Sequence, residues 1–395
     1  YSSDGHLLLQ KNNPLNHVTS YTYINDKALL KSITDPNELV TTYNYNFIDK
    51  VESVEYPDGT KEEFVRRWVG TDWHNGNSDH PDIPEGDEAV YYTWSKKNGV
   101  NEITTFYDQH ERKIRTVVKD FNENKIYTDY IYYDISGLLW KESLPYYKSK
   151  GESPQYIVYE YDKYDRVKTI TRPDGSKLTN NYSGNVLTTI NYDDQRKTIT
   201  YLPAGKPQKI KDNEITEIVY EYFGDGNVKS TIVNGIENSR INYTYDANGF
   251  LASMNDPSLG IRTYSYNAFG ELMSETNADS LTTYYTYDAL GRMTRRIDND
   301  GSTSWCYDVQ KIGLLDYSYH ETSNTDAPVV TENYIYDRFG RTIEHKQSLG
   351  TELQELSFLY DYNEWGLQKS VTYPDGYGVS YSYDYNGFTR TIVDM

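Results

Sequence analysis

The sequence predicts an all-β fold of consecutive antiparallel β-hairpins, about 21 residues each, that form a curled or spiralling sheet. Three observations carry this prediction: one phrase recurs at a fixed period, each copy reads as strand, turn and strand, and tyrosine dominates the aromatic residues. The 395 residues include 43 tyrosines, 10 phenylalanines and 6 tryptophans. A tyrosine buries its ring while its hydroxyl needs a partner, so this composition favours tyrosine-faced sheets over a deep aliphatic core.

The recurring phrase is Tyr-x-Tyr-Asp/Asn-x-x-Gly-x-hydrophobic. Its clearest copies place their second tyrosines at Tyr245, Tyr266 and Tyr287, a step of 21 residues both times. A fixed period in this range signals a repeat architecture in which each copy is one supersecondary unit. Markers of the same kind run from Tyr23 to Tyr383, so we expect a single array of repeats over residues 1–395.

Each part of the phrase has a physical reading. Tyr243 and Tyr245 are two residues apart, so in a strand both rings stand on one face. Asp246 can accept a hydrogen bond from the backbone two residues on, and Gly249 can adopt the left-handed conformation without steric cost. A second strand follows at once, and it ends in another turn that often reads Pro-Asp-Gly. One repeat is therefore predicted to be a hairpin plus the turn into the next hairpin.

The repeat motif is assigned to the tyrosines, turn residues and post-turn arginines of four copies. Rings that recur on one face are expected to form cross-strand ladders, and the arginines are expected to stack on a neighbouring ring or pair with a turn aspartate. The alternative is a carbohydrate-binding surface, because aromatic faces also stack on sugar rings. The assigned residues are Tyr243, Tyr245, Asp246, Gly249, Tyr264, Tyr266, Gly270, Tyr285, Tyr287, Asp288, Gly291, Arg292, Tyr334, Tyr336, Asp337, Gly340 and Arg341.

Four insertions lengthen the step between copies. They lie near residues 67–89, 145–155, 313–332 and 346–355 and are rich in Gly, Ser, Asn, Asp, Pro and Lys, so we interpret them as surface loops. About thirty strands, each about 4.8 Å wide, make a sheet too long to stay flat. It must either close as a hollow wall or wind as a solenoid.

Composition excludes several functions. A net charge of −20 argues against nucleic-acid binding and anionic membranes, and no apolar run is long enough for membrane insertion. The acidic segment 71–88 is the best metal candidate, with oxygen ligands suited to Ca²⁺ and with His74 and His80, but it lacks EF-hand spacing and we interpret it as a solvated insertion. We therefore predict no metal, no cofactor and no catalytic residue. Cys306 and the pair Asp193 and Asp194 are interpreted as an idle thiol and as turn residues.

The sequence Tyr285-Thr-Tyr287-Asp288-Ala-Leu-Gly291-Arg292, repeated closely at Tyr334 to Arg341, resembles the YD repeat of the Rhs family. That family includes bacterial polymorphic toxins, the cocoon-forming components of insecticidal Tc toxins, wall-associated repeat proteins and animal teneurins. The resemblance spans nearly the whole chain. It implies a β-ribbon that spirals into a hollow shell, which encloses a C-terminal effector in toxin members and serves adhesion or recognition in others.

The expected function is a structural, non-enzymatic shell segment that encloses or presents a toxin effector or other cargo. Its partner would be the rest of a longer polypeptide of which this chain is a segment, since the sequence starts in mid-phrase. The resemblance implies a secreted or cell-surface bacterial protein. The alternative is an extracellular adhesive module that binds glycans or a cell-surface protein.

Overall fold

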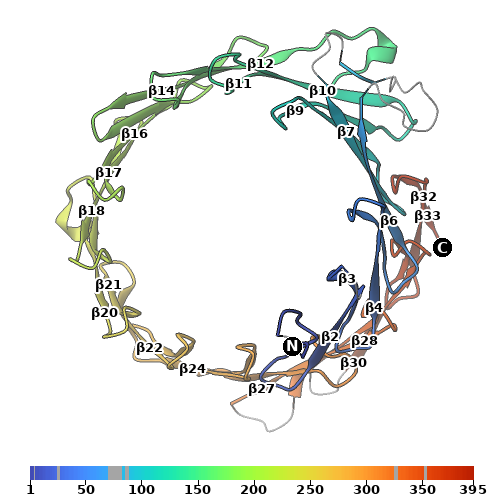
Figure 1. Ribbon diagram of the computed structural model, residues 1–395. Helices are drawn as coiled ribbons and strands as arrows, with labels where there is room; N and C mark the ends of the chain where they lie inside the picture. Colours follow the sequence, from blue (N-terminus) through green and yellow to red (C-terminus); the bar gives the residue numbers. More distant parts are fainter. Residues whose placement is uncertain (4, 25–26, 70–81, 85–88, 324–327, 351–353) are drawn as a thin grey trace. The chain divides into compact units, whose positions relative to one another are not determined.

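The computed structural model describes residues 1–3, 5–24, 27–69, 82–84, 89–323, 328–350 and 354–395. These residues form 33 β-strands and two short 3₁₀ helices, and no α-helix occurs among them. The strands pair with their neighbours in sequence, and the pairs are antiparallel (Figure 1). The predicted fold class, all-β with consecutive antiparallel hairpins, is confirmed.

The chain divides into two compact units. Unit 1 comprises residues 1–127 and 286–395, and unit 2 comprises residues 128–285. The boundaries fall within β10 (Lys125–Tyr132) and β24 (Thr282–Tyr287). Unit 2, coloured from turquoise to gold in Figure 1, is a curved strip of hairpins one layer thick.

Unit 1 contains two runs of strands. The first is β1 (Gln10–Asn12), β2 (Val18–Ile24), β3 (Leu29–Thr34), β4 (Val40–Tyr45), β5 (Val51–Glu55), β6 (Lys61–Trp68), β7 (Tyr91–Lys97), β8 (Ile103–Tyr107) and β9 (Lys113–Lys119). The second is β25 (Met293–Ile297), β26 (Gly301–Tyr307), β27 (Leu315–Thr322), β28 (Pro328–Tyr336), β29 (Thr342–Leu349), β30 (Gln354–Tyr362), β31 (Gln368–Thr372), β32 (Gly378–Tyr383) and β33 (Thr389–Asp394).

Unit 2 contains one run of strands with two short helical turns. In order these are β11 (Leu139–Ser143), η1 (Lys148–Lys150), β12 (Tyr156–Tyr161), β13 (Val167–Thr171), β14 (Lys177–Ser183), β15 (Val186–Ile190), β16 (Arg196–Tyr201), β17 (Pro207–Asp212), β18 (Thr216–Tyr222), β19 (Val228–Val233), η2 (Glu237–Ser239), β20 (Ile241–Tyr245), β21 (Leu251–Asp256), β22 (Gly260–Tyr266) and β23 (Leu272–Thr276).

The hairpins share one register pattern. Thr244 pairs with Ser253, but the next residue, Tyr245, pairs with Leu251, so the returning strand carries one extra residue just after the turn. The same shift precedes the second tyrosine of many other repeats, including Tyr336. This is a β-bulge, which bends the strand and increases its twist. We call the turn after the second tyrosine the near turn and the turn at the other end of the hairpin the far turn.

Two of the four predicted insertions differ from the expected surface loops. Residues 313–332 include β27 and the start of β28. Residues 346–355 include the end of β29 and the start of β30. These residues therefore lengthen two hairpins, because alternating sequences such as Tyr317-Ser-Tyr319 continue the ladder past the usual far turn. Residues 145–155 do form a connection, with η1 inside it, whereas most of residues 67–89 lie outside the described part of the chain.

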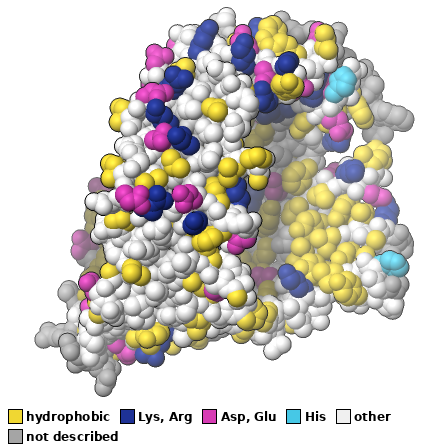
Figure 2. Space-filling view, turned by 90° about the vertical axis from the view of Figure 1, so that its left-hand side faces the viewer, with side chains coloured by type: hydrophobic (Ala, Val, Ile, Leu, Met, Phe, Trp, Pro, Cys, Tyr) yellow, Lys and Arg dark blue, Asp and Glu magenta, His cyan; other side chains and the backbone are white. Residues whose placement is uncertain are grey.

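Burial is concentrated in unit 1. Phe106 is completely buried, and Tyr91, Tyr92, Ile114 and Val117 nearly so, all between β7 and β9. In unit 2, β20 to β23 contain no buried residue, and their tyrosines are half-buried. The outward side of unit 2 in Figure 2 shows mainly uncharged polar groups with Lys, Arg, Asp and Glu interspersed and scattered hydrophobic side chains. Helices long and apolar enough to cross a bilayer are absent from the described residues.

Candidate functional site

The near turn is built by the side chain of its first residue. In the copy at residues 288–292, Asp288 Oδ1 accepts hydrogen bonds from the backbone of Leu290 (2.8 Å) and Arg292 (3.0 Å). Gly291 takes the left-handed conformation, with φ of 77°, that this geometry requires. Asn267 and Asn363 build the same turn with an amide oxygen. These copies thus use an Asp or an Asn oxygen, and the negative charge is not essential to the turn.

Arginine after the turn glycine closes an ion pair on the turn. Arg341 Nε donates to Asp337 at 2.6 Å, and its guanidinium lies 4.8 Å from the ring centre of Tyr362. Arg292 pairs with Asp288 at 2.7 Å and with Asp308 at 2.5 Å. The bond from Arg292 lowers the pKa of the Asp308 carboxyl. Burial alone would raise the pKa of Asp337, but hydrogen bonds from Arg341 and from the turn backbone outweigh it and lower that pKa.

In nine repeats the second tyrosine joins its hairpin to the preceding one. The ladder between β17 and β18 ends at the pair Lys209 and Val219, two residues short of Pro207. The carbonyl oxygen of Pro207 instead accepts a hydrogen bond from the hydroxyl of Tyr222 at 2.6 Å. The same bond joins Tyr23 to Leu8, Tyr45 to Leu30, Tyr161 to Leu139, Tyr182 to Val167, Tyr307 to Met293, Tyr336 to Leu315, Tyr362 to Thr342 and Tyr383 to Gln368. Phenylalanine could not make this bond, which explains the excess of tyrosine.

The rings also pack on one another across strands. Tyr334 stacks on His345 with ring centres 4.6 Å apart, and His345 stacks on Phe358 at 5.9 Å, so one ladder crosses β28, β29 and β30. Burial and the bond to Glu332 raise the pKa of Tyr334 to about 12. In unit 2, Phe250 packs on Tyr266 at 5.2 Å. The aromatic rings in these ladders stabilise the sheet through cross-strand pairs.

The opposite face carries small hydroxyl side chains in pairs. Thr244 lies 2.7 Å from Ser253, and Ser265 lies 2.7 Å from Ser274, both at exposed positions. The hydroxyl side chains thus lie on one face of the strands and the rings on the other, as the alternation in the sequence predicts. Each half-buried tyrosine face is therefore backed by a hydrated hydroxyl face.

The assigned motif residues fall in both units. Tyr243, Tyr245, Asp246, Gly249, Tyr264, Tyr266, Gly270 and Tyr285 lie in unit 2, and Tyr287, Asp288, Gly291, Arg292, Tyr334, Tyr336, Asp337, Gly340 and Arg341 lie in unit 1. Within each copy the structure brings the tyrosines, the turn oxygen and the turn glycine together in one hairpin. It does not gather the copies at a single site, because each copy occupies its own place along the strip.

Inside unit 1, far turns of residues 1–127 contact near turns of residues 286–395. The side chain of Asn37 exchanges two hydrogen bonds with the backbone of Ile312, at 2.8 and 2.9 Å. A Cβ at Gly366 would lie 3.6 Å from Asp58. Farther along, Gly387 packs so closely on Gly99 that an added Cβ would lie 1.9 Å from the Gly99 carbonyl oxygen. We call this set of contacts the strip junction.

A buried lysine lies at the strip junction. Lys96 Nζ donates to Asn386 Oδ1 at 2.7 Å and to the Val100 carbonyl at 2.8 Å, and it lies 4.2 Å from the ring centre of Tyr385. Asn386 in turn donates to Glu123 at 2.5 Å. Burial lowers the pKa of Lys96. Neither residue could be singled out from the sequence, because a lysine at the end of a strand and an asparagine in a turn are ordinary surface residues.

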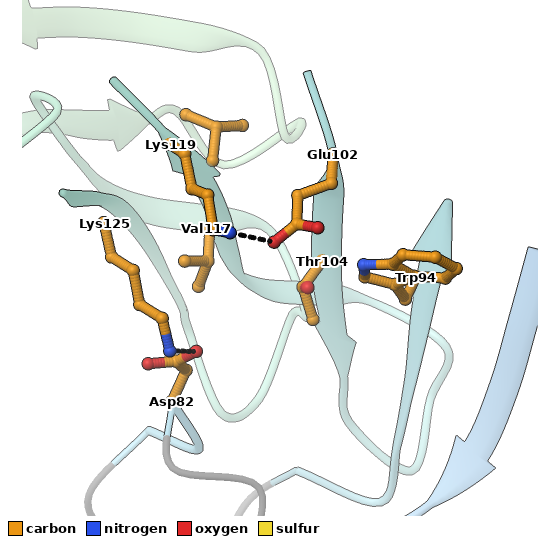
Figure 3. Close-up of a pocket in the computed structure, with 8 residues that line it drawn as sticks. Asp82, Trp94, Glu102, Thr104, Val117, Lys119 and Lys125 are labelled. Carbon is orange, nitrogen blue, oxygen red and sulfur yellow. Dashed lines mark hydrogen bonds and ion pairs between the residues drawn. The ribbon is translucent and has the colours of Figure 1, made fainter. Parts of the chain in front are cut away.

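A small pocket of about 100 Å³ lies among β7, β8 and β9 (Figure 3). Lys119 reaches Glu102 at 3.2 Å, and Lys125 reaches Asp82 at 2.7 Å, beside Trp94 and Thr104. Each charged group that lines the pocket therefore has an opposite charge beside it. The lining contains neither His nor Cys.

Asp82 is the described member of the acidic segment 71–88 that the sequence offered as a metal candidate. It is buried, and its carboxylate also accepts a hydrogen bond from Tyr127 at 2.7 Å. Its role is to anchor the insertion to β10, which a solvated loop would not do. The rest of that segment, apart from residues 82–84, lies outside the described residues. Within the described ranges, no group of three or more His, Cys, Asp or Glu side chains could hold a metal ion.

The fold is similar to that of a known family and to several solved structures. The family model for the teneurin YD-shell matches residues 89–311. No curated protein matches the chain. Similar folds occur in the crystal structure of TcdB2-TccC3 (TM-score 0.60, 11% identity, covering 98% of this chain and 24% of that one) and in the Tc holotoxin pore of Photorhabdus luminescens with a mutated TccC3 (TM-score 0.55, 15% identity, covering 91% and 21%).

A third similar structure is TcdB2-TccC3 without its hypervariable C-terminal region, with a TM-score of 0.52 and 11% identity over 98% of this chain. The chain spans between 21% and 29% of the length of these three structures. At these identities the likeness concerns the fold, which is the hairpin strip described above.

Proposed function

This chain belongs to the teneurin YD-shell family, and from that premise we propose that it forms part of the wall of a shell that encloses or presents another polypeptide. The partner would be a toxin effector or other cargo carried by the rest of a longer protein. The wall itself would carry out no catalysis, and the protein would act outside the cell or at its surface. The likeness of the strip to the Tc toxin structures supports this proposal.

The observation that carries the proposal is the tyrosine bond that joins nine of the hairpins to the preceding one. Bonds such as Tyr222 to Pro207 and Tyr383 to Gln368 hold neighbouring hairpins together at the bulge, where the backbone ladder has ended. A strip joined in this way can be extended hairpin by hairpin while remaining one layer thick. Such a thin, continuous layer suits a wall better than it suits a compact domain with a central active site.

The test is protease protection in the natural polypeptide that contains this chain. A specific protease site is introduced into the candidate cargo, and the same site is introduced as a control into the exposed connection at residues 148–152. If the strip is a wall, the control site is cut rapidly while the cargo site survives until the wall is unfolded. Equal cutting of both sites in the native protein contradicts enclosure.

A second candidate function is binding of glycans at an aromatic surface. Tyr373 and Tyr377 flank the far turn Pro374-Asp375-Gly376 with their rings 5.9 Å apart, and 39% and 46% of these residues are exposed. The Tyr377 hydroxyl bonds Asp394 at 2.7 Å, so a carboxylate lies beside the rings. Stacking rings with an adjacent carboxylate are suited to a sugar. A glycan array on which Tyr377→Ala abolishes signals given by the parent supports this function, and an array without signals contradicts it.

A further inference from the structure

The segment from β7 to β9 differs from the regular copies on the face opposite to its tyrosines. In the regular copies, the residue before the second tyrosine is a small hydroxyl residue, such as Thr286 or Ser382, and it is exposed. Tyr107 occupies the equivalent position, because the same register shift precedes it, but the residue before it is Phe106. Phe106 is completely buried. The face that is hydrated in the regular copies is therefore covered here.

Asp82 packs on this covered face. Its backbone carbonyl accepts a hydrogen bond from Arg115 at 3.1 Å, and Arg115 is the direct cross-strand partner of Phe106. Its carboxylate is bonded to Lys125 and Tyr127. The pocket of about 100 Å³ described above is therefore lined by this face of the sheet and by Asp82 (Figure 3).

Trp94, Thr104 and Val117 form one wall of the pocket. They are direct cross-strand partners on β7, β8 and β9, so their side chains share one face. The indole nitrogen of Trp94 points toward Thr104 (Figure 3). Among the described residues, neither this indole N–H nor the Thr104 hydroxyl has a hydrogen-bond partner, although Thr104 is only 7% exposed. The wall thus offers a donor and a hydroxyl that are available to a bound molecule.

The two ion pairs that line the pocket lie apart from one another. Lys119 and Glu102 form one pair, and Lys125 and Asp82 form the other (Figure 3). Burial lowers the pKa of Lys119, but hydrogen bonds to Glu123 and Glu102 outweigh burial and raise it, so this ammonium group stays charged. The two lysines and two carboxylates of the lining sum to zero charge. A ligand with one charge meets a repelling group beside each attracting group, whereas a ligand with both charges can pair with both.

We propose that this pocket binds a small zwitterion, namely a free α-amino acid of the size of glycine, alanine or serine. A water molecule needs about 10 to 15 Å³ of such a cavity, so the volume of about 100 Å³ accommodates a molecule of several non-hydrogen atoms. The carboxylate of the amino acid accepts hydrogen bonds from Trp94 and Thr104, and its ammonium group donates to Glu102. The proposal is independent of whether the strip encloses cargo.

Saturation-transfer NMR titrations of the purified chain test the proposal with glycine, L-alanine and L-serine as probes. Propionate, which keeps the carboxylate of alanine, and ethylamine, which keeps its ammonium group, are the single-charge comparisons. At least one amino acid is expected to bind with a Kd below about 1 mM, and both comparison compounds at least about tenfold more weakly, because each lacks one charged hydrogen-bonding group. If none of the amino acids binds, or if propionate or ethylamine binds as tightly, the proposal is overturned.

Two substitutions locate the binding site. Glu102→Gln removes the charge that pairs with the ammonium group and should weaken amino-acid binding at least about tenfold, and Thr104→Val removes the hydroxyl and should weaken it about fivefold. The matched control is Thr105→Val, which makes the same change at a buried position on the opposite face of β8 and should leave binding unchanged. Thermal melting checks that each variant is folded. Unchanged binding in both pocket variants, or an equal loss in the control, overturns the assignment of the site.

Discussion

The segment from β7 to β9 and the segment from β20 to β23 use the same repeat but are stabilised differently. The first has irregular copies of the motif and a buried cluster around Phe106, Tyr92 and Val117. The second has near-perfect copies and no buried residue. Where the sequence is most regular, stability comes from turn bonds, from ring packing such as that of Phe250 on Tyr266, and from paired serines and threonines. Where it is irregular, buried side chains supply the stability, Asp82 is bonded to Lys125 and Tyr127, and β7 contacts the strip junction.

The largest expected loss of stability comes from truncating Phe106, at the centre of the buried cluster. Phe106→Ala should lower the free energy of unfolding by about 3 to 5 kcal/mol, because Phe106 is completely buried and its loss leaves a cavity. Chemical denaturation followed by fluorescence measures the change. Phe269→Ala, at an exposed tip, is the control and should change stability by less than about 0.5 kcal/mol. Similar losses in both variants would contradict the contrast between the segments.

The next largest effect is the difference in stability between the same glycine substitution in a near turn at the strip junction and in an open near turn. Gly387→Ala should cost more than Gly249→Ala, although both glycines have φ near 84°. The methyl group at Gly387 would overlap the Gly99 carbonyl at the strip junction, whereas at Gly249 it meets nothing closer than Asn227 at 3.8 Å. We expect about 1 kcal/mol for Gly249→Ala and at least twice that for Gly387→Ala, measured by thermal melting. Equal costs would show that the strip junction does not hold in solution.

Loss of one tyrosine hydroxyl has a smaller expected effect. Tyr222→Phe keeps the ring but removes the hydrogen bond to the Pro207 carbonyl. This should cost about 1 kcal/mol, because the carbonyl loses its donor at a half-buried position. Tyr264→Phe, on the first tyrosine of another repeat, is the matched control and should be nearly neutral. If the two substitutions have equal effects on the denaturation midpoint, the hydroxyl does not join the hairpins.

The smallest expected effect is a change in the pH dependence of stability. Burial raises the pKa values of Asp288 and Asp337 in the folded state, but hydrogen bonds from Arg292, Arg341 and the turn backbone outweigh burial, so both pKa values are lowered overall. The stability they contribute is therefore fully present above the unfolded-state pKa of about 4 and is lost as pH falls through the folded-state values. Asp288→Asn with Asp337→Asn keeps the turn, as Asn267 and Asn363 do. Its melting temperature should fall less steeply below pH 4 than that of the parent, and parallel curves would contradict this.

Much of the fold could be predicted from local patterns. The alternation around Tyr243 and Tyr245, the turn oxygen of Asp246 and the conformational freedom of Gly249 all act within one hairpin, and consecutive hairpins follow from them. Asp165 and Glu111 adopt the left-handed conformation where glycine was expected, with φ of 61° each. The surrounding turn bonds impose this conformation on both residues, and of the two only Asp165 is of a type that adopts it readily.

The contacts between distant segments could not be predicted in the same way. Lys96 and Asn386 are 290 residues apart, and Asn386 occupies a variable position of the repeat phrase. Asp82 lies in an acidic stretch whose composition suggested hydration, yet it is buried between Lys125 and Tyr127. Such contacts join segments that are far apart in the sequence, and the local pattern of either segment carries no signal for its partner.

The tyrosine hydrogen bonds have a direction along the chain. In the bonds of Tyr45, Tyr222 and Tyr383, and in the others of the series, the donor lies 14 to 22 residues after its acceptor. Tyr133, which donates forward to Tyr159, is an exception. During synthesis on the ribosome, each new tyrosine thus emerges when its acceptor carbonyl is already in place. The strip is therefore suited to vectorial folding, in which an added hairpin bonds to one that has already formed, and the contacts of the strip junction form last.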